Sequence, residues 1–465
     1  MLRRIGFCGV LSLVACGLMA VSPGRLLAQG GGGMMGGASL GGVLIDADGV
    51  LKIQYVNDMT GQLTKARVNA GRAALRPEVA AKSGLRKVSL NRLEAELTKL
   101  LENGQAATDE MKYLVGLTRI QYVFYYPDTK DIVIAGPAEG WFTDLTGRVR
   151  GINSGRPVME LQDLIVALRT FAPGRGRSGT VGCTIDPTQE GLVRLQGFLK
   201  SLGSTTTRNV DTVGLSNGMK NALGLHTVKI MGVSPDTHFA QVLVEADYRM
   251  KLIGLGLEAP PAKMDTYVSK ASPSGSKNAM ARWYFTPDYE CVRASQDNLA
   301  MELVGTGVKL VSADEIVGAD GTRANSTKID RAAKAYATSF TKKFPEIANV
   351  QPVFAQLRNM VDMAIAAAYI QQHGYHEQAG WKMDLFSSEE SYPVETYSTP
   401  TMVEAACNVY WKSSTLMMPI GGGVLVQAEK ALEQENLLSD KDGAVEKARA
   451  GVSVGELAEG EWWWD

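Results

Sequence analysis

The segment from Arg119 to Trp141 decides the fold, and it reads RIQYVFYYPDTKDIVIAGPAEGW. Two runs rich in β-branched and aromatic residues flank a turn cluster at residues 127–131. Such an arrangement is typical of a β-hairpin. Pro127 suits the turn, because its φ angle is fixed there and its missing N–H group is not needed.

Both faces of the first run are largely apolar, because Tyr122 and Phe124 alternate with Val123 and Tyr125. A strand that is apolar on both faces is typical of a central strand covered from two sides. We therefore expect the hairpin to lie inside a sheet and to end at Gly136.

Two later segments share one pattern, in which a strand leads to a proline and then to a helix. The first strand opens at Thr180 and ends before Pro187, and the second opens at Thr227 and ends before Pro235. This alternation suggests crossover units laid on a sheet. Together with the hairpin, it predicts an α+β protein: a mixed sheet with a central β-hairpin, helices packed on it, and two strand–Pro–helix units in the middle of the chain.

Other elements follow from apolar periodicity. A leucine stripe after Ser89 predicts a helix, and residues 330–344 and 352–372 predict two more. The last of these is apolar over much of its circumference and is expected to be buried. Residues 403–411 and 415–426 predict a closing strand pair.

The first residues have the order of a secretory signal peptide. Arg3 and Arg4 precede an apolar run that a proline breaks, and Leu26-Leu27-Ala28 then ends in a small residue. We expect export, to the periplasm or the extracellular space, after cleavage near Ala28. A transmembrane anchor is one alternative, and a lipoprotein anchored through Cys16 is another.

We expect the chain to divide into five parts by composition. Residues 1–28 form the signal peptide and residues 29–40 a Gly/Met-rich spacer. An N-terminal α+β domain with the hairpin covers 41–260, and a C-terminal α+β domain covers 261–428. A charged tail, 429–465, ends in Trp-Trp-Trp-Asp.

Charge and cysteine content exclude several classes of protein. The chain has 465 residues and a formal net charge of −1, which gives no reason to expect a nucleic-acid partner. After removal of the leader, Cys183, Cys291 and Cys407 remain, far apart in the sequence. They do not make a disulfide-stapled scaffold, and we expect buried free thiols.

Several stretches occur in the order known from one family. They are Gly41-Gly42-Val43 with Asp48-Gly49-Val50, Leu85 to Leu90, Ile120 to Trp141, Gly155 to Val158, Ile185 to Thr188, His238-Phe239-Ala240 with Ala246 to Lys251, and Gly421 to Val424. The chain resembles, from about Gly41 to about Val426, a family of exported bacterial proteins described only as a domain of unknown function, number 1598 in its series. The resemblance implies no catalytic residues, because the family has none assigned.

Two serines fit hydrolase patterns in part. Ser216 lies in Gly-Leu-Ser-Asn-Gly, with Asp247 and His373 following in the order of a triad. The residues before it are polar and make a poor central strand, so a helix with glycines is the simpler interpretation. Ser339 has the Ser-x-x-Lys spacing with Lys342, but no further motif of that enzyme class follows.

Other motifs are explained better by loops and turns. The Gly174–Gly179 stretch has glycines in a dinucleotide-binding spacing but no helix after it, and its Arg175 and Arg177 fit a solvated loop. His373 and His376 flank a helix end and lack a second ligand cluster. The Asp46–Gly49 and Asp440–Gly443 stretches lack the later calcium ligands. The sequence thus identifies no catalytic, cofactor-binding or metal-binding residues.

The Trp462–Trp464 run offers two alternatives: it contacts a membrane surface or an envelope protein, or it folds back onto its own domain. The leading functional hypothesis is an exported, non-catalytic binding or structural protein of the envelope or the extracellular space. A secreted serine hydrolase and a small-ligand binder are the alternatives.

Overall fold

The structure is a computed structural model that describes residues 40–465 except 175, 177–178, 203–210, 272–278, 318–322, 326–329, 413, 452–453 and 455–456. The expectations for the signal peptide, Cys16, Arg175 and Arg177, and for the spacer up to residue 39, therefore lie outside the described residues. In the part that is described, none of the helices has the length and apolarity that crossing a bilayer requires.

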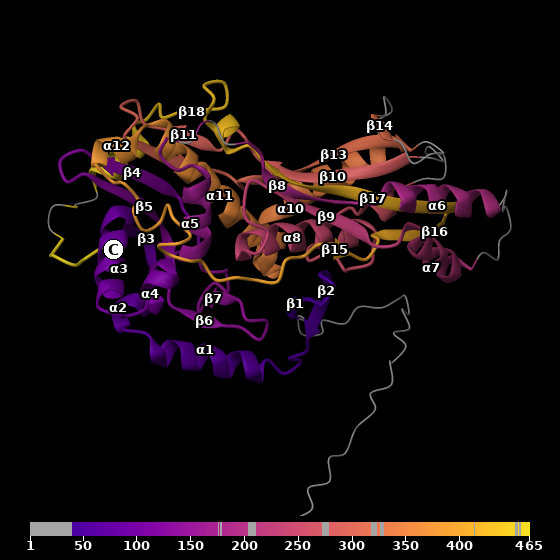
Figure 1. Cartoon of the computed structure of the whole chain (residues 1–465), viewed down its shortest axis with the longest axis horizontal. Coiled ribbons are helices and arrows are strands. Elements are labelled where there is room, and N and C mark those ends of the chain that lie inside the picture. Colours follow the sequence, from indigo (N-terminus) through magenta and orange to yellow (C-terminus); the bar gives the residue numbers. More distant parts are fainter. Residues whose placement is uncertain are drawn as a thin grey trace, which may run out of the picture. The chain divides into compact units, whose positions relative to one another are not determined.

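The larger sheet has ten strands among the described residues (Figure 1). In spatial order they are β1 (Leu40–Ile45), β2 (Val50–Val56), β15 (Met402–Val403), β9 (His226–Met231), β8 (Val181–Asp186), β17 (Ser414–Val426), β10 (Ala279–Pro287), β13 (Val308–Val317) and β14 (Arg323–Asn325), with β16 (Cys407–Lys412) paired to β17. The β10–β17 and β2–β15 pairs are parallel and the others antiparallel, so the sheet is mixed.

The predicted hairpin lies at the centre of a second, seven-stranded sheet. Its order is β18 (Leu438–Ser439), β11 (Val292–Ala294), β12 (Ala300–Leu303), β4 (Tyr122–Tyr126), β5 (Asp131–Ala138), β3 (Ser83–Ser89) and β19 (Trp463–Trp464). A two-stranded sheet of β6 (Trp141–Thr143) and β7 (Val149–Gly151) stands apart. The α+β class is confirmed, but the hairpin and the strand–Pro–helix units belong to different sheets.

Burial of the hairpin agrees with its sequence. Val123 and Phe124 are 0% exposed, and they belong to apolar clusters on opposite faces of β4. The turn closes with a hydrogen bond from the Lys130 amide to the Tyr126 carbonyl, 2.7 Å long. The second strand continues two residues beyond the expected end at Gly136, because β5 is paired on both sides, with β3 and β4.

Both strand–Pro–helix units are present. β8 leads to α6 (Gln189–Ser201), whose first turn is capped by Thr188, and β9 leads to α8 (His238–Gly254), capped by Thr237. The units are not parallel crossovers, because β8 and β9 pair antiparallel. Two helices, α6 and α7 (Thr212–Leu223), connect these strands. These two helices lead the chain away from the end of β8 and back to it, so β9 starts beside the end of β8.

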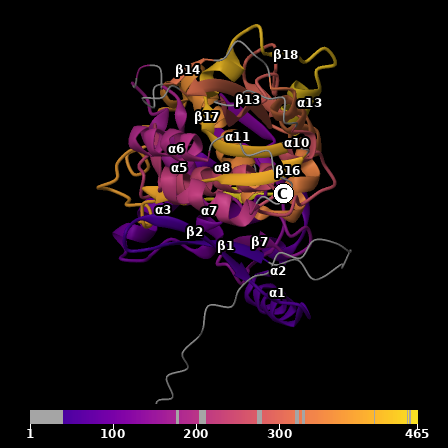
Figure 2. The ribbon, with the colours of Figure 1, turned by 90° about the vertical axis from the view of Figure 1, so that its right-hand side faces the viewer.

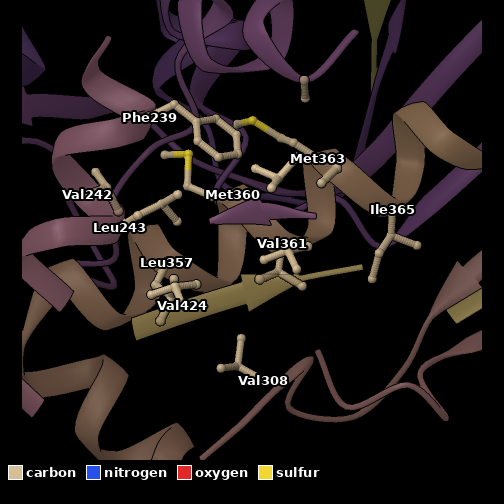
Figure 3. Close-up of a cluster of buried hydrophobic side chains, with 14 of the residues drawn as sticks. Phe239, Val242, Leu243, Val308, Leu357, Met360, Val361, Met363, Ile365 and Val424 are labelled. Carbon is tan, nitrogen blue, oxygen red and sulfur yellow. The ribbon is translucent and has the colours of Figure 1, made fainter. Parts of the chain in front are cut away.

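The most buried helix is α11 (Pro352–Gln372), which begins with proline at its first turn. Leu357 and Val361 face β17, and Met360 and Met363 lie beside Phe239 of α8 (Figure 3). The preceding helix α10 (Arg331–Val350) continues through Pro345, six residues beyond the predicted end. Phe344 and Ile347 are almost fully buried on either side of that proline, and their packing offsets its helix-breaking cost.

The remaining helices are shorter or lie at the surface. They are α1 (Gln62–Ala74), α2 (Pro77–Ala80), α3 (Leu90–Glu102), α4 (Asp109–Lys112), η1 (Leu114–Gly116), α5 (Leu161–Thr170), α9 (Tyr267–Lys270), α12 (Tyr375–Ala379), η2 (Ala428–Leu432) and α13 (Ala444–Ala450). Figure 2 shows α1 at the same side of the molecule as the β1–β2 hairpin and β7.

Glycines of the Gly421–Val424 motif allow β17 to pass between two strands. Gly422 has a φ angle of 126°, and a Cβ atom there would lie 1.9 Å from the Trp283 carbonyl oxygen of β10. At Gly423, a Cβ atom would lie 1.9 Å from the Cys183 carbonyl oxygen of β8. Side chains at these positions would force the three strands apart.

The tail folds back onto its own domain, which is one of the two alternatives expected for its tryptophans. Trp463 and Trp464 form β19 and pair with Val88 and Lys87 at the edge of the seven-stranded sheet. Cys183, Cys291 and Cys407 are buried free thiols, as expected.

Strands from either side of residue 260 pair with one another in both sheets, as β8 does with β17 and β4 with β12. The described residues group into one compact unit. The division into residues 41–260 and 261–428 stays a prediction about folding units.

Candidate functional site

The two serines that fit hydrolase patterns lie in ordinary helices. Ser216 is inside α7, so the strand-to-helix turn of a nucleophile elbow is missing there. Within the described residues, no hydrogen bond links Ser216 to Asp247 or His373, and Asp247 instead pairs with Lys251 at 2.7 Å. The Ser339 hydroxyl accepts a hydrogen bond from the Asp265 amide, at 3.0 Å, which is a structural contact.

The two neighbouring histidines lie in separate aromatic contacts. His373 packs against Tyr369, with ring centroids 4.3 Å apart, and His376 stacks on Trp381 at 5.0 Å. Burial lowers the pKa of His376 to about 4 and keeps its ring neutral.

The two Asp-rich stretches are turns. The Asp46 side chain accepts hydrogen bonds from the amides of Asp48 and Val50. In the same way, Asp440 accepts from the amides of Ala444 and Val445 at the start of α13.

Three residues to which the sequence analysis assigned no functional role do come together. Glu160, Asp163 and His238 each offer one ligand atom, and these atoms lie within 4.8 Å of one another. We call these three residues the acid–imidazole cluster. Its shortest contact joins His238 Nδ1 to Asp163 Oδ2 at 2.8 Å.

The starts of two helices position the cluster. Glu160 is the N-cap residue of α5, and Asp163 lies in the first turn of that helix, where a negative charge is favoured. His238 is the first residue of α8, which Thr237 caps through the Ala240 amide. A cation is disfavoured at this end of a helix. The two carboxylates beside His238 offset that cost.

Two other segments contact the imidazole. Gln356 of α11 places its side-chain nitrogen 3.4 Å from His238 Nε2, and its oxygen accepts a hydrogen bond of 2.9 Å from Arg148. The Tyr397 ring lies 5.6 Å from the imidazole ring, centroid to centroid. Arg148 also pairs with Glu245 of α8, so the cluster is tied to a wider network of charges.

The electrostatics of the cluster favour positive charge. Burial disfavours protonation of His238, but the charges of Asp163 and Glu160 outweigh this effect and raise the pKa of His238 to about 9. Burial also raises the pKa of Glu160, although the charge of His238 opposes the rise. At neutral pH the site therefore holds an imidazolium beside two carboxyl groups.

A cavity of about 290 Å³ opens next to the cluster. It lies between the end of α4, the start of α5 and the segment 392–395, and its lining residues are Lys112, Tyr113, Glu160, Leu161, Gln162, Tyr392, Pro393, Val394 and Glu395. We call it the acidic pocket, because Glu160 and Glu395 are its two carboxylates and Lys112 is the single basic residue of that lining.

Hydrogen bonds connect the two carboxylates of the acidic pocket. Gln162 donates to Glu160, at 2.6 Å, and to the Tyr397 hydroxyl, at 3.1 Å. Tyr397 in turn donates to Glu395 at 3.1 Å. This chain of hydrogen bonds forms a polar wall of the pocket, whose lining also includes Tyr113 and Tyr392.

The charged residues of the Ala246–Lys251 motif serve the fold. Lys251 is fully buried, and it donates to Asp247 and, at 3.1 Å, to the Ile185 carbonyl of β8. Arg249 is fully buried too, between Glu245 and Glu258, each 2.8 Å away. These ion pairs join α8 to its surroundings and lie away from the acidic pocket's lining.

Sequence reasoning missed the cluster because its members are distant along the chain and match no catalytic or metal-binding motif. Asp163 and His238 are separated by 75 residues. One local signal was available: an acidic residue at the start of one helix and a histidine at the start of another, both followed by strong apolar periodicity.

Comparison with known proteins gives one family. Residues 183–267 match the family described as "Protein of unknown function (DUF1598)". The predicted resemblance is confirmed over that region, which includes β8, β9 and α8 with His238. None of the curated proteins and none of the solved structures matches the chain.

Proposed function

We propose that this protein acts outside the cytosol as a non-catalytic binding protein, and that the acidic pocket binds a small organic cation. The observation that carries the proposal is the pairing of two carboxylates with two aromatic rings around one cavity. Carboxylates attract an ammonium group, and aromatic faces stabilise it further.

The size of the cavity limits the ligand. A volume of about 290 Å³ lies at the small end of ligand pockets, which favours a compact amine over an extended substrate. The polar wall from Gln162 through Tyr397 to Glu395 is held by its own hydrogen bonds. A pocket held in this way loses little entropy on binding.

Titration calorimetry with tetramethylammonium, ethanolamine and putrescine tests the proposal. We expect at least one probe to bind, and we expect Glu160→Gln and Glu395→Gln each to weaken it by about tenfold, or about 1.4 kcal/mol. Glu346→Gln is the matched control, because that side chain is 58% exposed on α10 and far from the lining. Failure of every ammonium probe to bind, or equal affinity in all variants, would contradict the proposal.

Export is the second part of the proposal, and it is supported by the leader-like order of residues 1–28. Mass spectrometry of the mature N-terminus in the native host tests it. A chain beginning near Gln29 supports release, and a lipid-modified Cys16 supports an anchored form. An intact Met1 on a cytosolic product would contradict export.

A further inference from the structure

We propose that the acid–imidazole cluster is a binding site for a divalent transition-metal ion, with Glu160, Asp163 and His238 as its protein ligands. This inference goes beyond the proposed function and does not depend on it, because the metal is tested without any organic ligand.

The spacing of the donor atoms suits one ion. Two ligands that each lie about 2.1 Å from a metal are roughly 3.0 Å apart at octahedral angles and roughly 3.4 Å apart at tetrahedral angles. His238 Nδ1 and Asp163 Oδ2 are separated by 2.8 Å, and the Glu160 ligand atom lies within 4.8 Å of both. An ion at this point takes the place of the proton that the imidazole otherwise holds.

A second observation points to a missing partner. Asp163 is 1% exposed, yet its Oδ1 atom accepts no hydrogen bond from any residue that the structure describes. A buried carboxylate oxygen without a partner carries a desolvation cost that a bound cation would remove.

The surroundings support the same conclusion. The two carboxylates beside His238 would attract a dication. The Tyr397 ring packs against the imidazole from outside the cluster, 5.6 Å away between ring centroids. Arg148 opposes a cation, but its own charge is paired with Glu245.

The donor set narrows the choice of metal. One imidazole nitrogen with two carboxylate oxygens suits zinc, cobalt or manganese better than calcium, which takes oxygen ligands alone. Three protein ligands leave further positions open, as zinc sites that bind a small molecule do. Glu160 also lines the acidic pocket, so we expect these open positions to face it.

Calorimetric titration of the full-length mature protein with Zn²⁺ alone is the test. We expect one site per chain, with affinity lowered at least about tenfold in His238→Gln, Asp163→Asn and Glu160→Gln. His373→Gln is the matched control, since that half-buried histidine lies in a different aromatic contact. Circular dichroism identifies any variant that fails to fold. We expect Glu160→Gln to fold, because Glu160 lies at a helix cap beside the cavity, so its Zn²⁺ affinity still tests the site.

Binding of Co²⁺ separates this site from the buried thiols. A site of nitrogen and oxygen ligands gives weak visible bands without thiolate charge-transfer absorption, and we expect that spectrum, lost in His238→Gln. No Zn²⁺ binding to the wild type, equal affinity in wild type and cluster variants, or a thiolate spectrum would overturn the inference. Loss of ammonium binding with intact Zn²⁺ binding would contradict only the proposed function.

Discussion

The buried guanidinium of Arg86 offers the sharpest test of how the tail is held. Arg86 is fully buried, and it forms a two-pronged ion pair with Asp465, with both nitrogen–oxygen distances at 2.8 Å. It also donates to four backbone carbonyls, those of Val79, Val115, Glu78 and Ala81. The Trp463 ring lies 4.9 Å from its guanidinium carbon.

These contacts predict different losses of stability when Arg86 or Asp465 is replaced. Arg86→Met leaves four carbonyls and a carboxylate without their donor, and we expect a loss of about 3–5 kcal/mol in the free energy of unfolding. Asp465→Asn costs less, about 1 kcal/mol, because Asp465 is 42% exposed and water replaces its charge interactions. Arg76→Met is the matched control, with an expected loss below about 0.5 kcal/mol, since Arg76 is 56% exposed.

Urea unfolding, followed by tryptophan fluorescence and by circular dichroism, measures all three variants. The order of loss should be Arg86→Met, then Asp465→Asn, then Arg76→Met. A loss of less than 1 kcal/mol for Arg86→Met, or equal losses for Arg86→Met and Asp465→Asn, would refute the account of Arg86 as the tie between the tail and the sheet.

Three further predictions concern the interior. Burial, with the charge of Lys251, lowers the pKa of His226 to about 3 from an unfolded value near 6.5. The folded ring stays neutral while the unfolded ring takes up a proton, so the free energy of unfolding should fall as pH drops from 6.5 toward 3. Over that range the urea midpoint of His226→Phe should fall less than that of the wild type. Gly422→Ala should lower the free energy of unfolding in urea by at least about 2 kcal/mol, because the new Cβ atom would meet the Trp283 carbonyl. Gly147→Ala is the control and should lower it by about 1 kcal/mol, because Gly147 also has a positive φ but open space around it. Leu357→Ala, at a fully buried position in α11, should lower the free energy of unfolding by about 2–5 kcal/mol. Val350→Ala, at a half-exposed position, should lower it by less than about 0.5 kcal/mol. Similar losses at both positions would contradict the assigned core.

Local sequence patterns predicted many of the helices and strands. The hairpin was predictable because Val123 and Phe124 are apolar on opposite faces, and the two strand–Pro–helix units because Thr188 and Thr237 follow strands. The separation into two sheets was not predictable from local patterns. It depends on pairings such as β17 with β8, which join segments more than 200 residues apart, and no local pattern encodes such partners.

The candidate site was harder to predict than the fold. Glu160 and Asp163 look like ordinary helix-start residues, and His238 looks like a surface histidine after a capping threonine. Their meeting depends on how α5 and α8 pack against α11. At Ser216 the preference for a helix containing glycines is confirmed, because a spacing of glycines around serine has catalytic meaning only on a strand-to-helix turn.

A crystal structure of the protein soaked with its tightest-binding ammonium probe tests the central claim most directly, namely that the acidic pocket is a cation site. The account predicts the probe between Tyr113 and Tyr392, with its nitrogen in contact with the carboxylate of Glu160 or Glu395. A probe bound elsewhere on the protein, with only solvent between those two rings, would contradict the account.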